Sequence, residues 1–216
     1  MLLIALLATA LPVSVDYDIT SEGRKWTVHA AAPRTGSKMP LVLLFHGAGG
    51  NGDLYLDRYG WDRLAEKQGF VVVAPDGIPA NPDNEPNFLT NPRVWNSGIL
   101  KAGPRSRIDD VAFVRTLIAD AKKRWSIDTD RIYVAGHSNG ASMSYRLGID
   151  LSDQLAAIAP VMGQNATRRA KPAHPVPTLA LLGTEDPLNP LNGGVSTLPW
   201  ANASLRRSRS KSMPGS

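Results

Sequence analysis

One pentapeptide, Gly136-His137-Ser138-Asn139-Gly140, constrains the fold of this chain more than any other feature. It stands between an apolar run at 132–135, expected to be a strand, and a helical pattern at 138–147. A G-x-S-x-G in this context predicts a sharp strand-to-helix turn, where a side chain at either glycine would collide with neighbouring backbone. The turn would lift Ser138 to the carboxyl end of a sheet, in front of a helix N-terminus, and make its hydroxyl a candidate nucleophile.

Apolar runs and amphipathic segments alternate along the rest of the chain. Continuous apolar runs at 41–45 (LVLLF) and 70–74 (FVVVA) are typical of strands buried on both faces. Further strands are expected from residue 15 onward and at 26–31, 156–161 and 178–182, helices at 54–68 and 108–125, and a long Pro/Asn-rich loop at 76–107. This alternation over 216 residues predicts one α/β domain, a mostly parallel sheet with helices on both faces.

A glycine-rich loop at 46–50 (HGAGG) directly follows the strand expected at 41–45. Small residues let backbone N–H groups approach a reaction centre, and an oxyanion hole needs two such donors. One donor comes from this loop and one from the residue after the nucleophile, so we assign them to Ala48 and Asn139. His46 is expected to be structural, because it stands ahead of the glycines of the loop and comes before the serine in the chain.

A carboxylate follows the strand expected at 178–182, within Gly183-Thr184-Glu185-Asp186-Pro187. At the carboxyl end of a strand it can orient and support an imidazolium. Asp186 is the first candidate for this acid and Glu185 the second. The alternative is that these are solvated acids of a surface turn.

Together these residues resemble the polyhydroxybutyrate-depolymerase-like esterase family, which also includes feruloyl and acetylxylan esterases. The resemblance runs from about Trp26 to Trp200 and is most specific at 109–114 (DDVAFV), 127–133 (IDTDRIY), 136–146 (GHSNGASMSYR) and 156–163 (AAIAPVMG). It implies the α/β-hydrolase fold and a Ser–Asp–His triad with no cofactor and no metal, with Ser138 as nucleophile and Asp186 as acid. Trp95, in the segment 95–98 (WNSG), resembles a family segment near the active-site mouth and is expected to bind substrate.

The chain departs from this family at the histidine. The family histidine follows the acid, usually before Trp-Pro, whereas all four histidines here precede Asp186: His29, His46, His137 and His174. We expect His174 at the amino end of its strand, away from Ser138, and the His137 side chain pointing into the fold. A serine hydroxyl without a base is a weak nucleophile, so the chain as written is expected to be nearly inactive.

Both ends of the sequence suggest segments outside the domain, which we place at 15–200. The apolar start, with Ala8-Thr9-Ala10 as a cleavage site, predicts a signal peptide over 1–14 and a secreted or periplasmic protein; a buried first strand is the alternative. Residues 201–216 lack apolar periodicity and are expected to be a disordered basic tail. A final strand and helix are expected after Trp200 but are not found there, so the C-terminal part of the domain is expected to be truncated, by a frame change or a deletion.

Charge and composition exclude several classes of partner. The net charge is +5, but four basic residues of the tail account for most of it, and the remainder carries +1. This near-neutral body argues against a nucleic-acid binder. The apolar start is too short for a stable membrane anchor, and a chain without cysteine forms no disulfide.

The sequence therefore predicts a serine-dependent carboxylic ester hydrolase that acts through an acyl-enzyme on a small or polymeric ester. Polyhydroxyalkanoate, feruloyl and acetyl esters all remain open as substrates, as does the oligomeric state. The alternative is a non-catalytic binding protein on a hydrolase scaffold. The strained turn at Ser138 favours the hydrolase, since a binding protein has no need of it.

Overall fold

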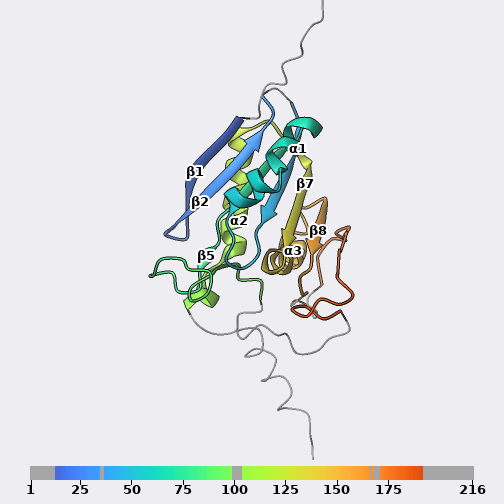
Figure 1. The fold of residues 1–216 in the computed structure, drawn as a ribbon. Coiled ribbons are helices and arrows are strands. Elements are labelled where there is room, and N and C mark those ends of the chain that lie inside the picture. The colour runs from blue at the N-terminus through green and yellow to red at the C-terminus, as the bar shows by residue number, and fades with distance from the viewer. Residues whose placement is uncertain (1–12, 35–36, 99–103, 166, 168–170, 192–216) are drawn as a thin grey trace, which may run out of the picture.

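The computed structural model describes residues 13–34, 37–98, 104–165, 167 and 171–191. Their main sheet has six strands in the order β1-β2-β4-β3-β7-β8 (Figure 1). β3, β4, β7 and β8 run parallel, and an antiparallel β1–β2 hairpin joins them beside β4. This confirms the mostly parallel sheet. The strands are β1 (Val13–Ser21), β2 (Arg24–Ala32), β3 (Met39–Phe45), β4 (Val71–Pro75), β7 (Ile127–His137) and β8 (Ala157–Val161).

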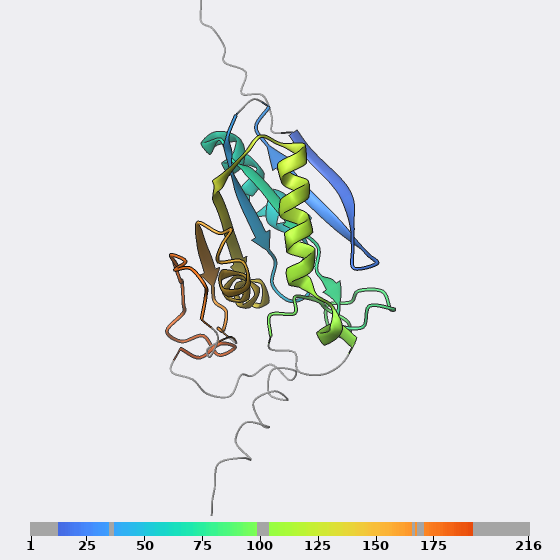
Figure 2. The same cartoon turned by 180° about the vertical axis from the view of Figure 1, so that it is seen from behind.

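Helices cover both faces of this sheet, as expected. They are α1 (Trp61–Gln68), α2 (Asp110–Arg124) and α3 (Asn139–Asp150). Leu117 of α2 and Leu147 of α3 lie in the larger core cluster on one face, and Ala65 of α1 lies in a smaller cluster on the other. Figure 1 shows α1 in front of the sheet, and Figure 2 shows α2 and α3 from behind. All five residues of β4 are buried between these layers, which explains its continuous apolar sequence.

The helix expected at 54–68 is interrupted. A π-helix occupies Leu54–Arg58, and α1 begins only at Trp61. Gly60 separates the two with φ of 72°, a left-handed conformation that ends one helix before the next begins. The long loop also contains short elements that the sequence did not predict: β5 (Ile78–Pro79) paired with β6 (Arg93–Val94), and a 3-10 helix at Pro104–Arg107.

The segment 178–182 does not form the expected strand. It makes two isolated parallel bridges to β8, Ile158–Thr178 and Val161–Leu181. Leu179 remains 67% exposed, because within the described residues nothing packs on the outer side of this segment. At the other end, β1 begins at Val13, two residues inside the expected signal peptide, while 1–12 and the tail 201–216 lie outside the described residues.

Candidate active site

Ser138 sits in a strained turn between β7 and α3. Its φ is 54° and its ψ is −115°, an unusual conformation for a residue with a side chain. A Cβ atom added at Gly136 would overlap the carbonyl oxygen of Gly140, and one at Gly140 would overlap that of Phe45. Both glycines are therefore required by close backbone approach, which confirms the sharp turn predicted from the sequence.

The glycine-rich loop lies against this turn. A Cβ atom at Gly47 would stand 3.3 Å from Ser138 Cβ, so the loop passes beside the candidate nucleophile as expected. The Gly47 amide donates to the Tyr55 hydroxyl, and the amides of Gly49 and Gly50 donate to backbone carbonyl groups. Ala48 lies among these three glycines. Within the described residues, its amide hydrogen has no acceptor.

The Asn139 amide likewise has no acceptor within the described part of the chain. Asn139 is the first residue of α3, where backbone amides have no partner inside the helix. The positive end of the helix dipole adds to the attraction for a negative charge. Ala48 and Asn139 thus carry N–H groups without an acceptor among the described residues, one on each of the two segments beside Ser138.

His46 is enclosed by the protein and is 0% exposed. Its Nε2 accepts from the Gly77 amide at 2.8 Å, so the proton is on Nδ1, which donates to the Gly47 carbonyl oxygen at 2.7 Å. Burial lowers the pKa of His46 to about 4, so the imidazole is neutral. With both ring nitrogens occupied by backbone groups, His46 has no lone pair left for Ser138.

The structure places Trp95 differently from the substrate-facing position expected. Its side chain is 0% exposed and offers no surface to a substrate. The indole Nε1 donates to the His46 carbonyl oxygen at 3.0 Å, and the backbone amide donates to the Asn139 side chain at 2.6 Å. Trp95 thus joins the glycine-rich loop to the start of α3.

Asp186 and Ser138 line the same cavity, of about 440 Å³, together with His137, Met162 and Glu185. One Asp186 carboxylate oxygen accepts from the backbone amides of Leu188 and Asn189 at 2.8 and 3.0 Å. These bonds hold the pKa of Asp186 below its usual range, the Asn189 amide contributing most. Asp186 is therefore an ionised carboxylate that faces the same space as the candidate nucleophile.

His137 is an exposed residue rather than one enclosed by the fold. Its Nδ1 lies 3.0 Å from the Tyr55 hydroxyl, and this hydrogen bond holds the ring beside Tyr55. Partial desolvation lowers the pKa of His137, an effect that the charge of Asp186 opposes. The backbone amide of His174 lies 3.4 Å from the Ser152 hydroxyl, at the amino end of β8 and away from Ser138, as expected.

Tyr55 is the residue of this site that sequence reasoning missed. It lies within an amphipathic segment where an aromatic side chain is ordinary core material, and no local pattern distinguishes it. The described residues also contain no cluster of three His, Asp or Glu side chains suited to a metal ion, and no helix with the length and apolarity of a membrane span.

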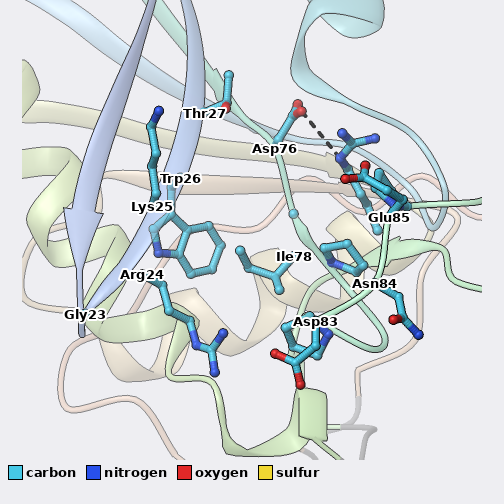
Figure 3. Close-up of a pocket in the computed structure, with 15 residues that line it drawn as sticks. Gly23, Arg24, Lys25, Trp26, Thr27, Asp76, Ile78, Asp83, Asn84 and Glu85 are labelled. Carbon is cyan, nitrogen blue, oxygen red and sulfur yellow. Dashed lines mark ion pairs between the residues drawn. The ribbon is translucent and has the colours of Figure 1, made fainter.

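A second cavity of about 440 Å³ lies between the β1–β2 turn and the loop after β4 (Figure 3). Asp76 lines it, with a carboxylate oxygen 3.5 Å from Arg93 Nε. The other Asp76 oxygen accepts from the Gly52 amide at 2.7 Å, and so anchors the chain just beyond the glycine-rich loop. This cavity contains neither Ser138 nor Asp186, and it is separate from the candidate active site.

Known proteins resemble this chain over much of its length. The profile of the family described as Esterase PHB depolymerase matches residues 27–169. The chain is 30% identical over 166 residues to the bifunctional acetylxylan esterase/xylanase XynS20E of Neocallimastix patriciarum, covering 76% of this chain and 22% of that protein. It is 31% identical over 179 residues to feruloyl esterase B of Piromyces equi, covering 80% and 31%. The chain thus spans less than a third of the length of either relative.

Solved structures agree on the fold. An S-formylglutathione hydrolase from Agrobacterium tumefaciens is 18% identical, with a TM-score of 0.57 over 71% of this chain and 58% of that chain. At this identity the likeness shows the fold alone, which is that of the α/β-hydrolases.

Proposed function

The chain belongs to the Esterase PHB depolymerase family, and on this premise we propose that it is a serine-dependent carboxylic ester hydrolase. The observation that carries the proposal is the strained conformation of Ser138, supported by the Ala48 and Asn139 amides, which have no acceptor within the part of the chain that the structure describes. Strain of this kind persists in a fold only where the surroundings enforce it, and it is concentrated at reactive sites.

In the proposed reaction the Ser138 hydroxyl gives its proton to a base as its oxygen attacks the carbonyl carbon of the ester, and the carbonyl electron pair moves to the carbonyl oxygen. The base later returns this proton to the leaving alcohol. The N–H groups of Ala48 and Asn139 donate to this oxyanion. When it collapses, the alcohol leaves with a proton and the acyl group remains on Ser138. Water then hydrolyses the acyl-enzyme. Asp186 supports the base that moves these protons.

None of the four histidines of the chain is placed to be that base. His46 has both ring nitrogens occupied, His29 pairs with two carboxylates, and His174 lies at the far end of β8. His137 uses Nδ1 for Tyr55. We therefore propose that the chain of 216 residues turns esters over only slowly, and that the imidazole partner of Asp186 is not among its own side chains.

The proposed substrates are esters of the kinds named for the relatives, acetylxylan and feruloyl esters, and the polyhydroxybutyrate of the family name. We further propose that residues 15–200 form the catalytic domain, that 1–14 direct export to a secreted or periplasmic location, and that 201–216 are a tail outside the domain. N-terminal sequencing of protein recovered from an expressing bacterial host tests the export proposal. An intact Met1 in the cytosol would refute it.

Chemical rescue with imidazole tests the enzymatic proposal. Hydrolysis of p-nitrophenyl butyrate is measured with and without added imidazole, for the wild-type chain and for Ser138→Ala. We expect a rate near background without imidazole, and a rise with imidazole that exceeds the rise seen with Ser138→Ala. Equal rates for the two proteins would favour the non-catalytic binding protein. An ordinary enzymatic rate without imidazole would show that one of the four histidines does act as the base.

A further inference from the structure

We infer that Tyr55 is a positioning residue that fixes the distance between the two oxyanion donors; this inference rests on the proposed function. Tyr55 belongs to the π-helix Leu54–Arg58 and is 7% exposed. Its hydroxyl lies 3.0 Å from the Gly47 amide and 3.0 Å from His137 Nδ1. Gly47 directly precedes the donor Ala48, and His137 directly precedes Ser138. One buried hydroxyl therefore bridges the two segments that carry the site.

The direction of these hydrogen bonds follows from the hydrogens available. A backbone amide only donates, so the Gly47 N–H donates to the Tyr55 oxygen. The single phenolic hydrogen then donates to His137 Nδ1, which leaves the ring proton on Nε2. The hydroxyl is thus held from both sides and has little freedom to rotate. The same assignment leaves the neutral His137 ring without a free lone pair.

A second link lies on the other face of the sheet. Trp95 donates from its indole to the His46 carbonyl and exchanges two hydrogen bonds with the Asn139 side chain. Trp95 belongs to the larger core cluster, and Tyr55 to the smaller one. The glycine-rich loop is therefore fastened to the turn from both sides.

The Tyr55 link matters because it keeps the oxyanion donors in place. An oxyanion hole is effective only while its donors stay within a few tenths of an ångström of their place, since the donors must not rearrange during the reaction. Glycines at 47, 49 and 50 make the loop intrinsically mobile. Without the Tyr55 hydroxyl, the Gly47 amide would lose its acceptor, and the loop would be held to the turn only from the side of Trp95.

The test uses Tyr55→Phe, which removes only the hydroxyl, with Tyr59→Phe as its matched control. Tyr59 lies one turn further along and packs edge-on against Tyr55 with ring centroids 4.9 Å apart, but its residue is well exposed. The readout is the Kd of phenylboronic acid. Its boron accepts a lone pair from Ser138 Oγ, the serine proton passes to solvent, and the tetrahedral boronate anion occupies the place of the oxyanion. This probe needs no general base, so it applies to the chain as it is.

We expect Tyr55→Phe to raise this Kd by about tenfold. Removal of an oxyanion-hole donor lowers turnover by about 10²–10³-fold, and a donor that is only displaced should lose part of this effect. Tyr59→Phe should leave the Kd unchanged. His137→Ala removes the other end of the same link, so it should raise the Kd as well. The variant that carries both substitutions should then bind phenylboronic acid with the same Kd as Tyr55→Phe alone. Two independent structural losses would instead add to each other.

The outcomes separate the two claims. If phenylboronic acid binds the wild type no better than Ser138→Ala, the proposed function fails. If binding depends on Ser138 but Tyr55→Phe retains the wild-type Kd, the positioning role is wrong and the proposed function stands. If Tyr55→Phe does not fold, His137→Ala decides, because an exposed side chain can be removed without loss of the core. An unchanged Kd for His137→Ala then overturns the inference.

Discussion

The backbone amide of Trp95 donates to the Asn139 side-chain oxygen at 2.6 Å, and the Asn139 side-chain nitrogen donates back to the Trp95 carbonyl at 3.2 Å. This closed pair joins the long loop to the first residue of α3. Asn139→Ala removes both bonds but keeps the backbone N–H assigned to the oxyanion hole. We expect the free energy of unfolding to fall by about 1–3 kcal/mol, because a buried amide loses its partner.

Urea denaturation measures this change. Asn139→Asp is the informative companion, because its carboxylate can still accept from the Trp95 amide but cannot donate to the carbonyl. It should lose less stability than Asn139→Ala. Equal losses would show that the retained acceptor bond does not outweigh the repulsion between the new carboxylate and the Trp95 carbonyl oxygen.

A buried ion pair fastens the other end of the same loop. Arg105 and Asp110 are almost wholly buried and contact each other directly, and Arg105 also donates to the Val94 carbonyl at 2.7 and 3.0 Å. Asp110→Ala would leave the guanidinium charge buried without its counter-ion, which costs about 3–5 kcal/mol in comparable pairs.

The control for this variant is Asp120→Ala, which breaks the partly exposed pair of Asp120 with Arg124 at 2.6 Å. Pairs of this kind contribute about 0–1 kcal/mol. Both variants are compared by thermal and urea unfolding. A small loss at Asp110, similar to that at Asp120, would mean that the buried pair does not hold the loop.

Gly140 tests the geometry of the turn. A Cβ atom there would overlap the backbone oxygen of Phe45, which belongs to the central strand β3 and cannot move away. Gly140→Ala should therefore destabilise the protein strongly. Gly69→Ala is the matched control, because Gly69 has φ of 75° but open space around it, so only the conformational cost of about 1 kcal/mol applies. Comparable losses for the two variants would contradict the close approach at Gly140.

His29 predicts a dependence of stability on pH. The hydrogen bond to Asp76 raises the pKa of His29 to about 9; Asp16 adds to this and partial burial opposes it. Because the folded-state pKa lies above the unfolded value, the stabilisation is complete below about pH 6.5 and is lost as the pH rises through about 9.

We expect the free energy of unfolding to fall by about 1–3 kcal/mol over this range, given 1.36 kcal/mol per pKa unit and some screening by solvent. His29→Gln should flatten the profile. Asp76 also contacts Arg93 (Figure 3) and accepts from the Gly52 amide, so it keeps two partners in that variant. If the free energy of unfolding of His29→Gln still falls over this pH range, another group is responsible for the pH dependence.

Local sequence was sufficient to predict the turn at Ser138 and the glycine-rich loop. Each is specified by residues within five positions, and steric exclusion of Cβ atoms makes the glycines diagnostic. The bounds of α2 were predicted within two residues from the helical spacing of its apolar side chains. The structure adds the Asp109 cap, whose carboxylate accepts from the amides of Val111 and Ala112.

Contacts between distant parts of the chain could not be predicted in this way. Trp95 was expected at the mouth of the site, but its burial depends on packing against Trp26 and Phe45, which are far away in the sequence. The position of His137 depends on a hydroxyl 82 residues earlier in the chain. The segment 178–182 has a strand sequence, yet a strand also needs neighbours, and that is a property of the fold rather than of the segment.

The central claim is that Ser138 is the nucleophile. Its most direct test is prolonged treatment of the folded chain with a fluorophosphonate, followed by digestion and mass spectrometry of the peptides. The account predicts one phosphonyl adduct, on Ser138, which heat denaturation before treatment abolishes and which Ser138→Ala lacks. An adduct on a different serine, or the same labelling in Ser138→Ala, would contradict it.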